Sequence, residues 1–167
     1  MHEFLVSIEE LSLSTWVRSG QSVWGYATIL FLHTVGMGIV AGVGCMIDLR
    51  LLGVAPGIPI KPLERLYPLM WAGFVLNLLT GTALLMADAT VKMTNPVFGV
   101  KMVFVALGVI VLARMRKRIF EHPHLDQGPP PGAKAMAWMS LACWLGAIIT
   151  GRLLGYTGDV AGLATGQ

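Results

Sequence analysis

The stretch VWGYATILFLHTVGMGIVAGVGCMI, residues 23–47, decides the fold. It contains no Asp, Glu, Lys or Arg, and His33 is its one basic residue. As an α-helix rising 1.5 Å per residue it would be ~37 Å long, which exceeds the ~30 Å hydrocarbon core of a bilayer. This stretch therefore predicts a transmembrane helix with a single histidine inside it.

Three further apolar stretches have the length of a membrane span. They cover residues 66–86, 96–113 and 135–156, and a GPPPG motif at 128–132 precedes the last of them. Hydrophobic residues make up 55% of the 167 residues and charged residues only 13%. A soluble domain of this composition could not cover its surface with polar groups. The sequence therefore predicts an all-α, integral membrane four-helix bundle, with residues 1–167 forming a single membrane domain.

An N-terminal helix is expected to lie in the membrane interface. Residues 3–18 place apolar side chains at spacings that roughly suit one helical face: Phe4, Leu5, Ile8, Leu11 and Trp16. This pattern is typical of a short amphipathic helix that lies on a bilayer. Because no basic region precedes these apolar residues, the segment is not expected to be a cleavable signal peptide.

The basic residues predict the orientation of the bundle. Eight of the twelve flank the loops after the first and third spans: Arg50, Lys61, Arg65, Arg114, Arg116, Lys117, Arg118 and Lys134. The other four lie toward the opposite side: Arg18, Lys92, Lys101 and Arg152. Lys and Arg are retained on the cytoplasmic side, so both termini should lie outside the cytoplasm. The net charge of +3 thus reflects orientation and does not indicate nucleic-acid binding.

His33 is the strongest candidate for a functional residue. It lies ten residues into the first span, ~15 Å below the outer boundary and near the middle of the bilayer. Its helix continues into the glycine-rich run GMGIVAGVG, which begins with Gly36 and Met37. This run leaves room for a flat ligand or another backbone. Ionisable groups at this depth usually mark a site, and the alternative is a neutral histidine that only packs the bundle.

Three other polar residues fall inside the spans. Lys101 and Arg152 are each ~6–8 Å deep on the outer side, where they could snorkel to headgroups or together receive two carboxylates. Asn77 lies midway along the second span, and the stripe Gly73–Asn77–Gly81 must face protein because an amide in lipid has unmet hydrogen bonds. Asn77 is the better candidate for a structural role than for a ligand.

The first span is expected to close at the cytoplasmic edge with the sequence IDLRLLG. Asp48 and Arg50 are two residues apart and cannot face each other on a helix. Each is therefore expected to pair with another group at that edge. Cys45 and Cys143 are too few and too apolar in their surroundings for a disulfide framework or a zinc site.

This arrangement suits a b-type haem. An imidazole from His33 would bind the iron, Gly36, Met37 and Asn77 would border the macrocycle, and Lys101 and Arg152 would meet the propionates. The spans contain no second histidine. The other axial position could be taken by methionine, stay open, or be filled by His33 of a second copy, brought close by a GxxxG contact at Gly38 and Gly42.

The same residues are compatible with other functions. His33 could titrate in a transport or proton-relay bundle, continued by Asn77 or Thr80, although no intramembrane carboxylate is expected beside it. Copper binding is another alternative, because ten methionines accompany His33 and Cys143. A scaffold or assembly subunit without a ligand is the third. The favoured prediction is an electron-transfer protein that has a redox partner. No motif indicates an enzyme with its own nucleophile.

The sequences FLHTVGMGIVAGVG, CMIDLRLLG, LYPLMWAGFVLNLLTGTALL and GRLLGYTG together resemble an uncharacterised bacterial family of four-helix inner-membrane proteins. The likeness covers most of residues 24–156 and implies a bacterial inner-membrane location. It marks as positions to test His33, Asp48, Arg50, Asn77, Lys101 and Arg152. The layout is more loosely similar to small membrane b-type cytochromes and to the membrane domain of copper-resistance proteins. The chain departs from the cytochrome pattern by lacking a second histidine.

Overall fold

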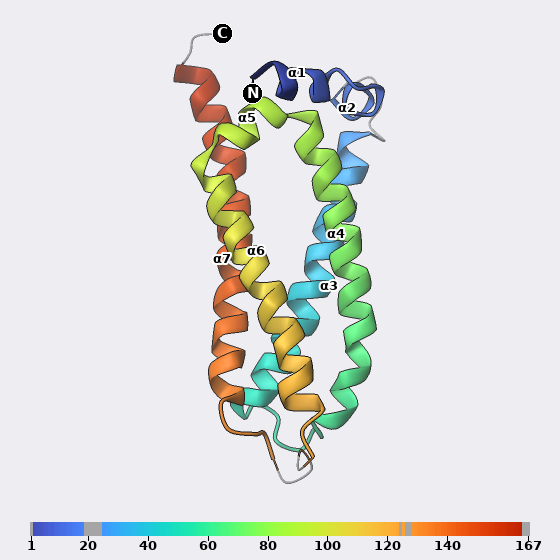
Figure 1. Ribbon diagram of the computed structural model, residues 1–167, viewed down its shortest axis with the longest axis vertical. Helices are drawn as coiled ribbons and strands as arrows, with labels where there is room; N and C mark the ends of the chain where they lie inside the picture. The colour runs from blue at the N-terminus through green and yellow to red at the C-terminus, as the bar shows by residue number, and fades with distance from the viewer. Residues whose placement is uncertain (1, 19–24, 124, 126–127, 165–167) are drawn as a thin grey trace.

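The computed structural model describes residues 2–18, 25–123, 125 and 128–164, and within these ranges it is helical and has no strand. Four long helices run along the molecule: α3 (Tyr26–Leu52), α4 (Tyr67–Ala87), α6 (Pro96–Met115) and α7 (Ala133–Ala164). Figure 1 shows them alternating in direction, with short connections at both ends. The predicted all-α four-helix fold is confirmed.

The four helices are long and apolar enough to cross a membrane. Each presents large hydrophobic side chains outward, for example Phe31 on α3, Leu79 on α4, Val103 on α6 and Leu145 on α7. An isolated soluble domain could not leave so many of them in water. The chain is therefore a multi-pass membrane protein. Val23 and Trp24, the predicted start of the first span, lie outside the described residues.

Several helix ends differ from the predicted boundaries. Helix α3 continues to Leu52, where Gly53 closes it in a left-handed conformation (φ 107°). A 3-10 helix, η1 (Lys61–Leu66), leads into α4, and a π-helical turn, η2 (Arg116–Phe120), extends α6. Asn95 caps α6 by accepting a hydrogen bond from Val97 N at 2.9 Å.

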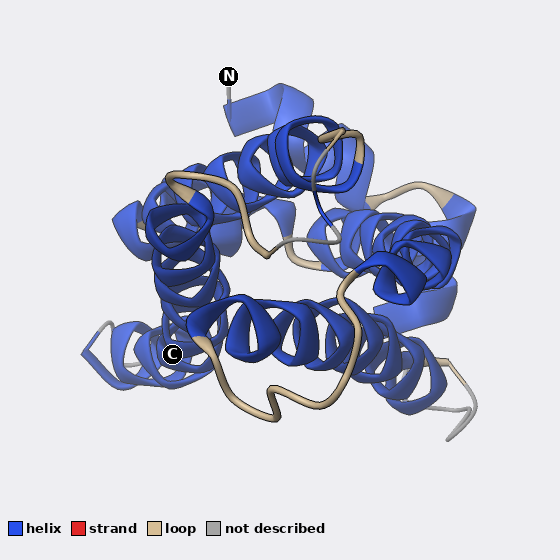
Figure 2. Cartoon of the chain, turned by 90° about the horizontal axis from the view of Figure 1, so that it is seen from below, coloured by secondary structure: helices blue, strands red, loops and turns tan. Residues whose placement is uncertain are grey.

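The helices are packed as two pairs. Helix α3 packs along α4 and α6 packs along α7, while the main contact between the pairs is α3 against α7. The hydrophobic core lies in the half where α3 and α6 end and α4 and α7 begin, and its central members are Ile47, Tyr67, Met70, Met115 and Ala137. Toward the other end the pairs diverge in Figure 1, and the view along the bundle in Figure 2 shows the helices around a common centre.

Glycine backbone contact fixes the crossing of α3 and α4. A Cβ atom at Gly36 would lie 2.8 Å from the carbonyl oxygen of Gly73 and 2.9 Å from the backbone nitrogen of Asn77. A Cβ at Gly73 would lie 2.7 Å from Ile39 Cγ2. The space beside Gly36 is thus filled by the backbone of α4. Gly36 was predicted to border a ligand, and this role differs from the packing role that the structure shows.

The N-terminal segment forms two short helices, α1 (His2–Glu9) and α2 (Ser12–Arg18), instead of one helix over 3–18. The Ser14 hydroxyl donates to Ile8 O at 2.7 Å, a contact across six residues that a continuous helix does not make. Figure 1 shows both helices lying across one end of the bundle. Glu9 Oε1 fastens them there, because it accepts hydrogen bonds from Thr90 N and Oγ1 in α5 (Ala89–Thr94), each at 2.7 Å.

Candidate ligand cavity around His33

The His33 side chain is fixed by the backbone of α4. Its Nδ1 lies 3.0 Å from the carbonyl oxygen of Asn77 and 3.2 Å from Thr80 Oγ1. In return, Asn77 Nδ2 donates to the carbonyl oxygen of His33 at 2.8 Å. The two helices therefore hold each other at this level through a reciprocal pair of hydrogen bonds, and Asn77 has the structural role that the sequence favoured.

These contacts determine which ring nitrogen carries the proton. The carbonyl oxygen of Asn77 can only accept, so Nδ1 must be the donor. The Thr80 hydroxyl agrees with this assignment. Its proton is donated to Leu76 O at 2.6 Å, so its oxygen can only accept a hydrogen bond from His33 Nδ1. In the neutral imidazole, Nε2 then carries the lone pair. Within the described ranges Nε2 has no hydrogen-bond partner.

Gly81 supports the imidazole ring from α4. A Cβ there would lie 2.9 Å from His33 Cε1 and 3.3 Å from Nδ1, so any side chain at this position would displace the ring. The predicted stripe Gly73–Asn77–Gly81 does face protein, and each member contacts α3. Gly81 is a site residue that the stripe indicated only as a packing position.

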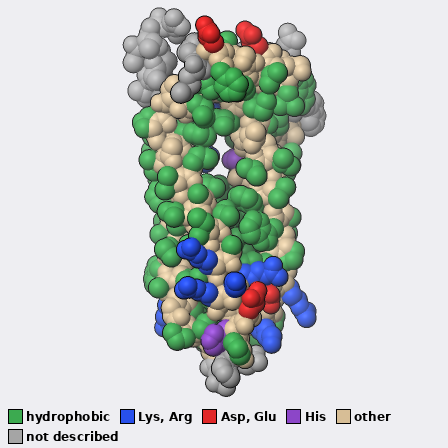
Figure 3. Space-filling model, viewed as in Figure 1, with side chains coloured by type: hydrophobic (Ala, Val, Ile, Leu, Met, Phe, Trp, Pro, Cys, Tyr) green, Lys and Arg blue, Asp and Glu red, His purple; other side chains and the backbone are tan. Residues whose placement is uncertain are grey.

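A cavity of about 430 Å³ opens beside the ring, at the level where the two helix pairs diverge. Pockets of this size, in the range of ~300–1,000 Å³, hold cofactors and other small ligands. All four long helices line it, through His33 and Met37, Gly81 and Leu84, Phe98 and Lys101, and Gly151 and Arg152, among others. Figure 3 shows the molecule hollowed between its helix pairs in the upper half. Four of the six predicted site residues thus share one cavity, whereas Gly36 and Asn77 do not line it.

Three cations border this cavity, and they are not equivalent. Lys92 Nζ is engaged with Asp88 Oδ2 at 2.9 Å and with Leu84 O at 2.6 Å. Lys101 and Arg152 form no ion pair with an acidic side chain in the described ranges. Lys101 is partly buried beside Gly151, and Arg152 is exposed. These are the two residues that were predicted to receive carboxylates.

The region offers few ligands for a bare metal ion. No group of three or more His, Cys, Asp or Glu side chains forms a cluster in the described part of the chain. Met37 lies one turn from His33 and adds a single thioether. A ligand that needs only one protein donor therefore suits the cavity better than copper, which is usually held by three or four.

The prediction that Asp48 pairs with another group at the membrane edge was wrong. The side chain does not pair at the edge of the bundle: it is 1% exposed, and neither carboxylate oxygen has a hydrogen-bond partner among the described residues. Arg50 does pair at the edge, donating to Ile58 O and, at 3.0 Å, to Pro56 O. Because α3 continues to Leu52, Asp48 lies inside the helix and faces α4 and α7. The bundle thus contains an intramembrane carboxyl group that was not expected.

Comparison of the chain with family models, curated proteins and solved structures finds no match. The resemblance to a bacterial inner-membrane family remains a prediction. The function proposed below therefore rests on the fold and on the cavity at His33.

Proposed function

We propose that this protein binds haem b through His33 and serves electron transfer in a bacterial inner membrane. The observation that carries the proposal is the hydrogen bond from His33 Nδ1 to the carbonyl oxygen of Asn77, beside a cavity of about 430 Å³. Histidines that bind metals through Nε2 usually donate their Nδ1 proton to a carbonyl or carboxylate, which fixes the tautomer and the ring orientation. His33 has this arrangement.

The cavity offers both apolar and cationic side chains to a haem. Leu30, Leu84, Phe98 and Ile148 line it with apolar side chains that exclude water and suit a porphyrin face. Lys101 and Arg152 would supply two positive charges for the propionates. When bound, haem would supply a centre that gains and loses one electron, and a redox partner would exchange electrons with it.

Each chain is expected to bind its own haem. A second copy is proposed to pack on the first span at Gly38 and Gly42. A Cβ at either glycine would meet nothing within 4 Å, so this face of α3 is open to another helix. These glycines follow His33 by five and nine residues, which at 3.6 residues per turn puts them ~140–180° around the helix from it. A dimer on that face would hold the two His33 rings apart. A haem shared across that axis is therefore not proposed.

Haem titration of the detergent-purified protein tests the cavity. Gly81→Ala should displace the His33 ring, because the new Cβ would lie 2.9 Å from Cε1. We expect haem affinity to fall about tenfold or more, as when a group that orients a metal ligand is removed. Gly99→Ala is the matched control, since a Cβ there meets nothing within 4 Å, and its affinity should equal that of the native chain. Equal affinities for all three proteins would contradict this site.

The orientation proposed from the sequence has its own test. Figure 3 shows Lys and Arg side chains gathered at the lower end of the molecule, which by the positive-inside rule is the cytoplasmic end. Both termini should then be periplasmic. We expect alkaline phosphatase fused after Gln167 to be active in cells, and the same reporter inserted near His122 to be inactive. The reverse pattern would overturn the assignment.

A further inference from the structure

A second polar site lies in the half of the bundle away from His33. Four buried polar atoms have no hydrogen-bond partner among the described residues: both carboxylate oxygens of Asp48, Tyr67 Oη and Trp144 Nε1. Asp48 and Tyr67 are each 1% exposed, and Trp144 is 5% exposed. Buried polar groups are nearly always paired, so four orphaned atoms in one region point to a function or to a bound species.

These side chains are layered across three helices. Asp48 of α3 lies beside Ser140 of α7 and within electrostatic range of Tyr67 of α4, and these residues form one layer. One turn away, Gly44 faces the Trp144 indole, whose nitrogen would be 3.8 Å from a Cβ at Gly44. The indole also packs on Gly108 of α6. The carboxyl group is thus enclosed on all sides by the bundle and not by lipid.

The charged groups nearest to Asp48 are too few to hold an ionised carboxylate. Its own helix contributes Arg50, which is engaged with the carbonyl oxygens of Pro56 and Ile58. Helix α4 presents Tyr67, α7 presents Ser140 and Trp144, and α6 presents apolar side chains such as Val111 and Met115. An ionised carboxylate that has no cation and only the Ser140 hydroxyl beside it costs far more in such a place than a neutral acid does.

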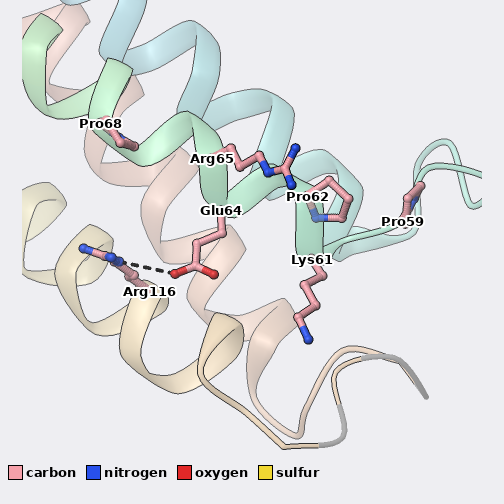
Figure 4. Close-up of a pocket in the computed structure, with 7 residues that line it drawn as sticks. All are labelled: Pro59, Lys61, Pro62, Glu64, Arg65, Pro68 and Arg116. Atoms are coloured by element: carbon pink, nitrogen blue, oxygen red, sulfur yellow. Dashed lines mark ion pairs between the residues drawn. The ribbon is translucent and has the colours of Figure 1, made fainter.

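Tyr67 connects this site to the surface. Its ring lies under the guanidinium of Arg116, with 6.0 Å from the Cζ atom to the ring centroid. Arg116 in turn pairs with Glu64 at 3.6 Å. Figure 4 shows this ion pair at the rim of an open, proline-lined pocket at the Lys- and Arg-rich end. Arg116 is exposed and Glu64 is half-buried, whereas the Tyr67 hydroxyl is buried, so Tyr67 lies between the ion pair at the surface and the interior of the bundle.

We propose that Asp48 is a proton-binding site in the centre of the bundle, holding its proton as a neutral carboxylic acid and exchanging it with the Lys- and Arg-rich end through Tyr67. On protonation, one carboxylate oxygen of Asp48 forms an O–H bond as an O–H bond of the proton donor breaks. For transfer, a water molecule bridging Asp48 and Tyr67 Oη gives one proton to the carboxylate and takes the hydroxyl proton of Tyr67. The tyrosine oxygen then takes a proton from solvent water at the Lys- and Arg-rich end, so the tyrosine and the bridging water end unchanged. The site needs no haem and is independent of the function proposed for His33.

Infrared spectroscopy of the native protein in lipid tests this proposal. A carbonyl-stretch band of a protonated carboxylic acid should persist at a pH where exposed carboxyl groups are ionised. It should shift when aspartate is isotope-labelled, which requires no mutation, and vanish in Asp48→Asn. Glu64→Gln is the matched control and should keep the band. Absence of the band from the native protein, or its survival unchanged in Asp48→Asn, would overturn the proposal. So would a sodium-dependent thermal stability that Asp48→Asn abolishes, because that would identify a cation site.

The route is tested by exchange of the band in heavy water. Tyr67→Phe removes only the hydroxyl and should slow exchange about tenfold, which corresponds to the loss of one hydrogen-bonding step. Tyr156→Phe, at the opposite end of α7, should exchange like the native protein. Equal rates for Tyr67→Phe and the native protein would overturn the role of Tyr67.

Discussion

His33→Ala should yield a folded, membrane-inserted protein that no longer binds haem. The imidazole is the one iron ligand proposed from this chain, so its removal should weaken haem binding by more than about 100-fold, beyond the effect of losing a supporting group. The visible spectrum of the purified variant should lack the Soret band. His122→Ala, which alters a histidine in the loop at the other end of the bundle, should retain it.

Chemical rescue separates a ligand role from a structural one. The alanine leaves a space beside Gly81 that free imidazole can enter. Added imidazole should restore the Soret band of His33→Ala if the ring acts by binding iron. If His33 only supports the contact with Asn77, imidazole would not restore it, and circular dichroism would show reduced helix content or stability in the variant.

Gly36→Ala should be the most destabilising single-atom change in the bundle. The added methyl group would lie within 2.9 Å of two backbone atoms of α4, and backbone cannot move aside as a flexible side chain can. Overpacking of this kind costs about 1–3 kcal/mol. Thermal unfolding in mild detergent, followed by circular dichroism, should show a midpoint lower by several degrees.

Gly99→Ala is the matched control for this change. It lies on α6, away from the α3–α4 crossing, and a Cβ there meets nothing within 4 Å. Its midpoint should equal or slightly exceed that of the native chain, because alanine has the higher helix propensity. Since the displaced α4 would also carry Asn77 away from His33, only Gly36→Ala should lower haem affinity. Equal stability for the two variants would show that the α3–α4 crossing is looser than the contacts at Gly36 indicate.

The sequence predicted the spans well because their signal is local. Length and hydropathy suffice to identify four helices, and the strong polarity of the Arg114–Arg118 cluster marks a helix end. The gathering of His33, Met37, Lys101 and Arg152 was also predictable, since depth along a span follows from the rise per residue.

What the sequence could not predict depends on contacts between helices. Glycine at position 36 was compatible with a ligand or with a neighbouring helix, and only the position of Gly73 decides between them. The break between α1 and α2 is accompanied by a hydrogen bond from Ser14 to Ile8 O, which no periodicity reveals.

Asp48 was misplaced for a different reason. The predicted first span ended at Ile47, which put the carboxyl group at the membrane edge, whereas α3 continues to Leu52. A signal was present: Gly36, Val40, Gly44 and Asp48 follow one another at intervals of four, and all four are buried. Extending that stripe by one turn would have placed the carboxyl group inside the bundle.

The most direct test of the proposed function is the haem content of the native protein purified from membranes in mild detergent. We predict a Soret band and a ratio of one haem per chain. A folded preparation that is colourless and stays so when haem is added would contradict it. One haem per two chains with a saturated, bis-histidine spectrum would contradict the geometry assigned to His33.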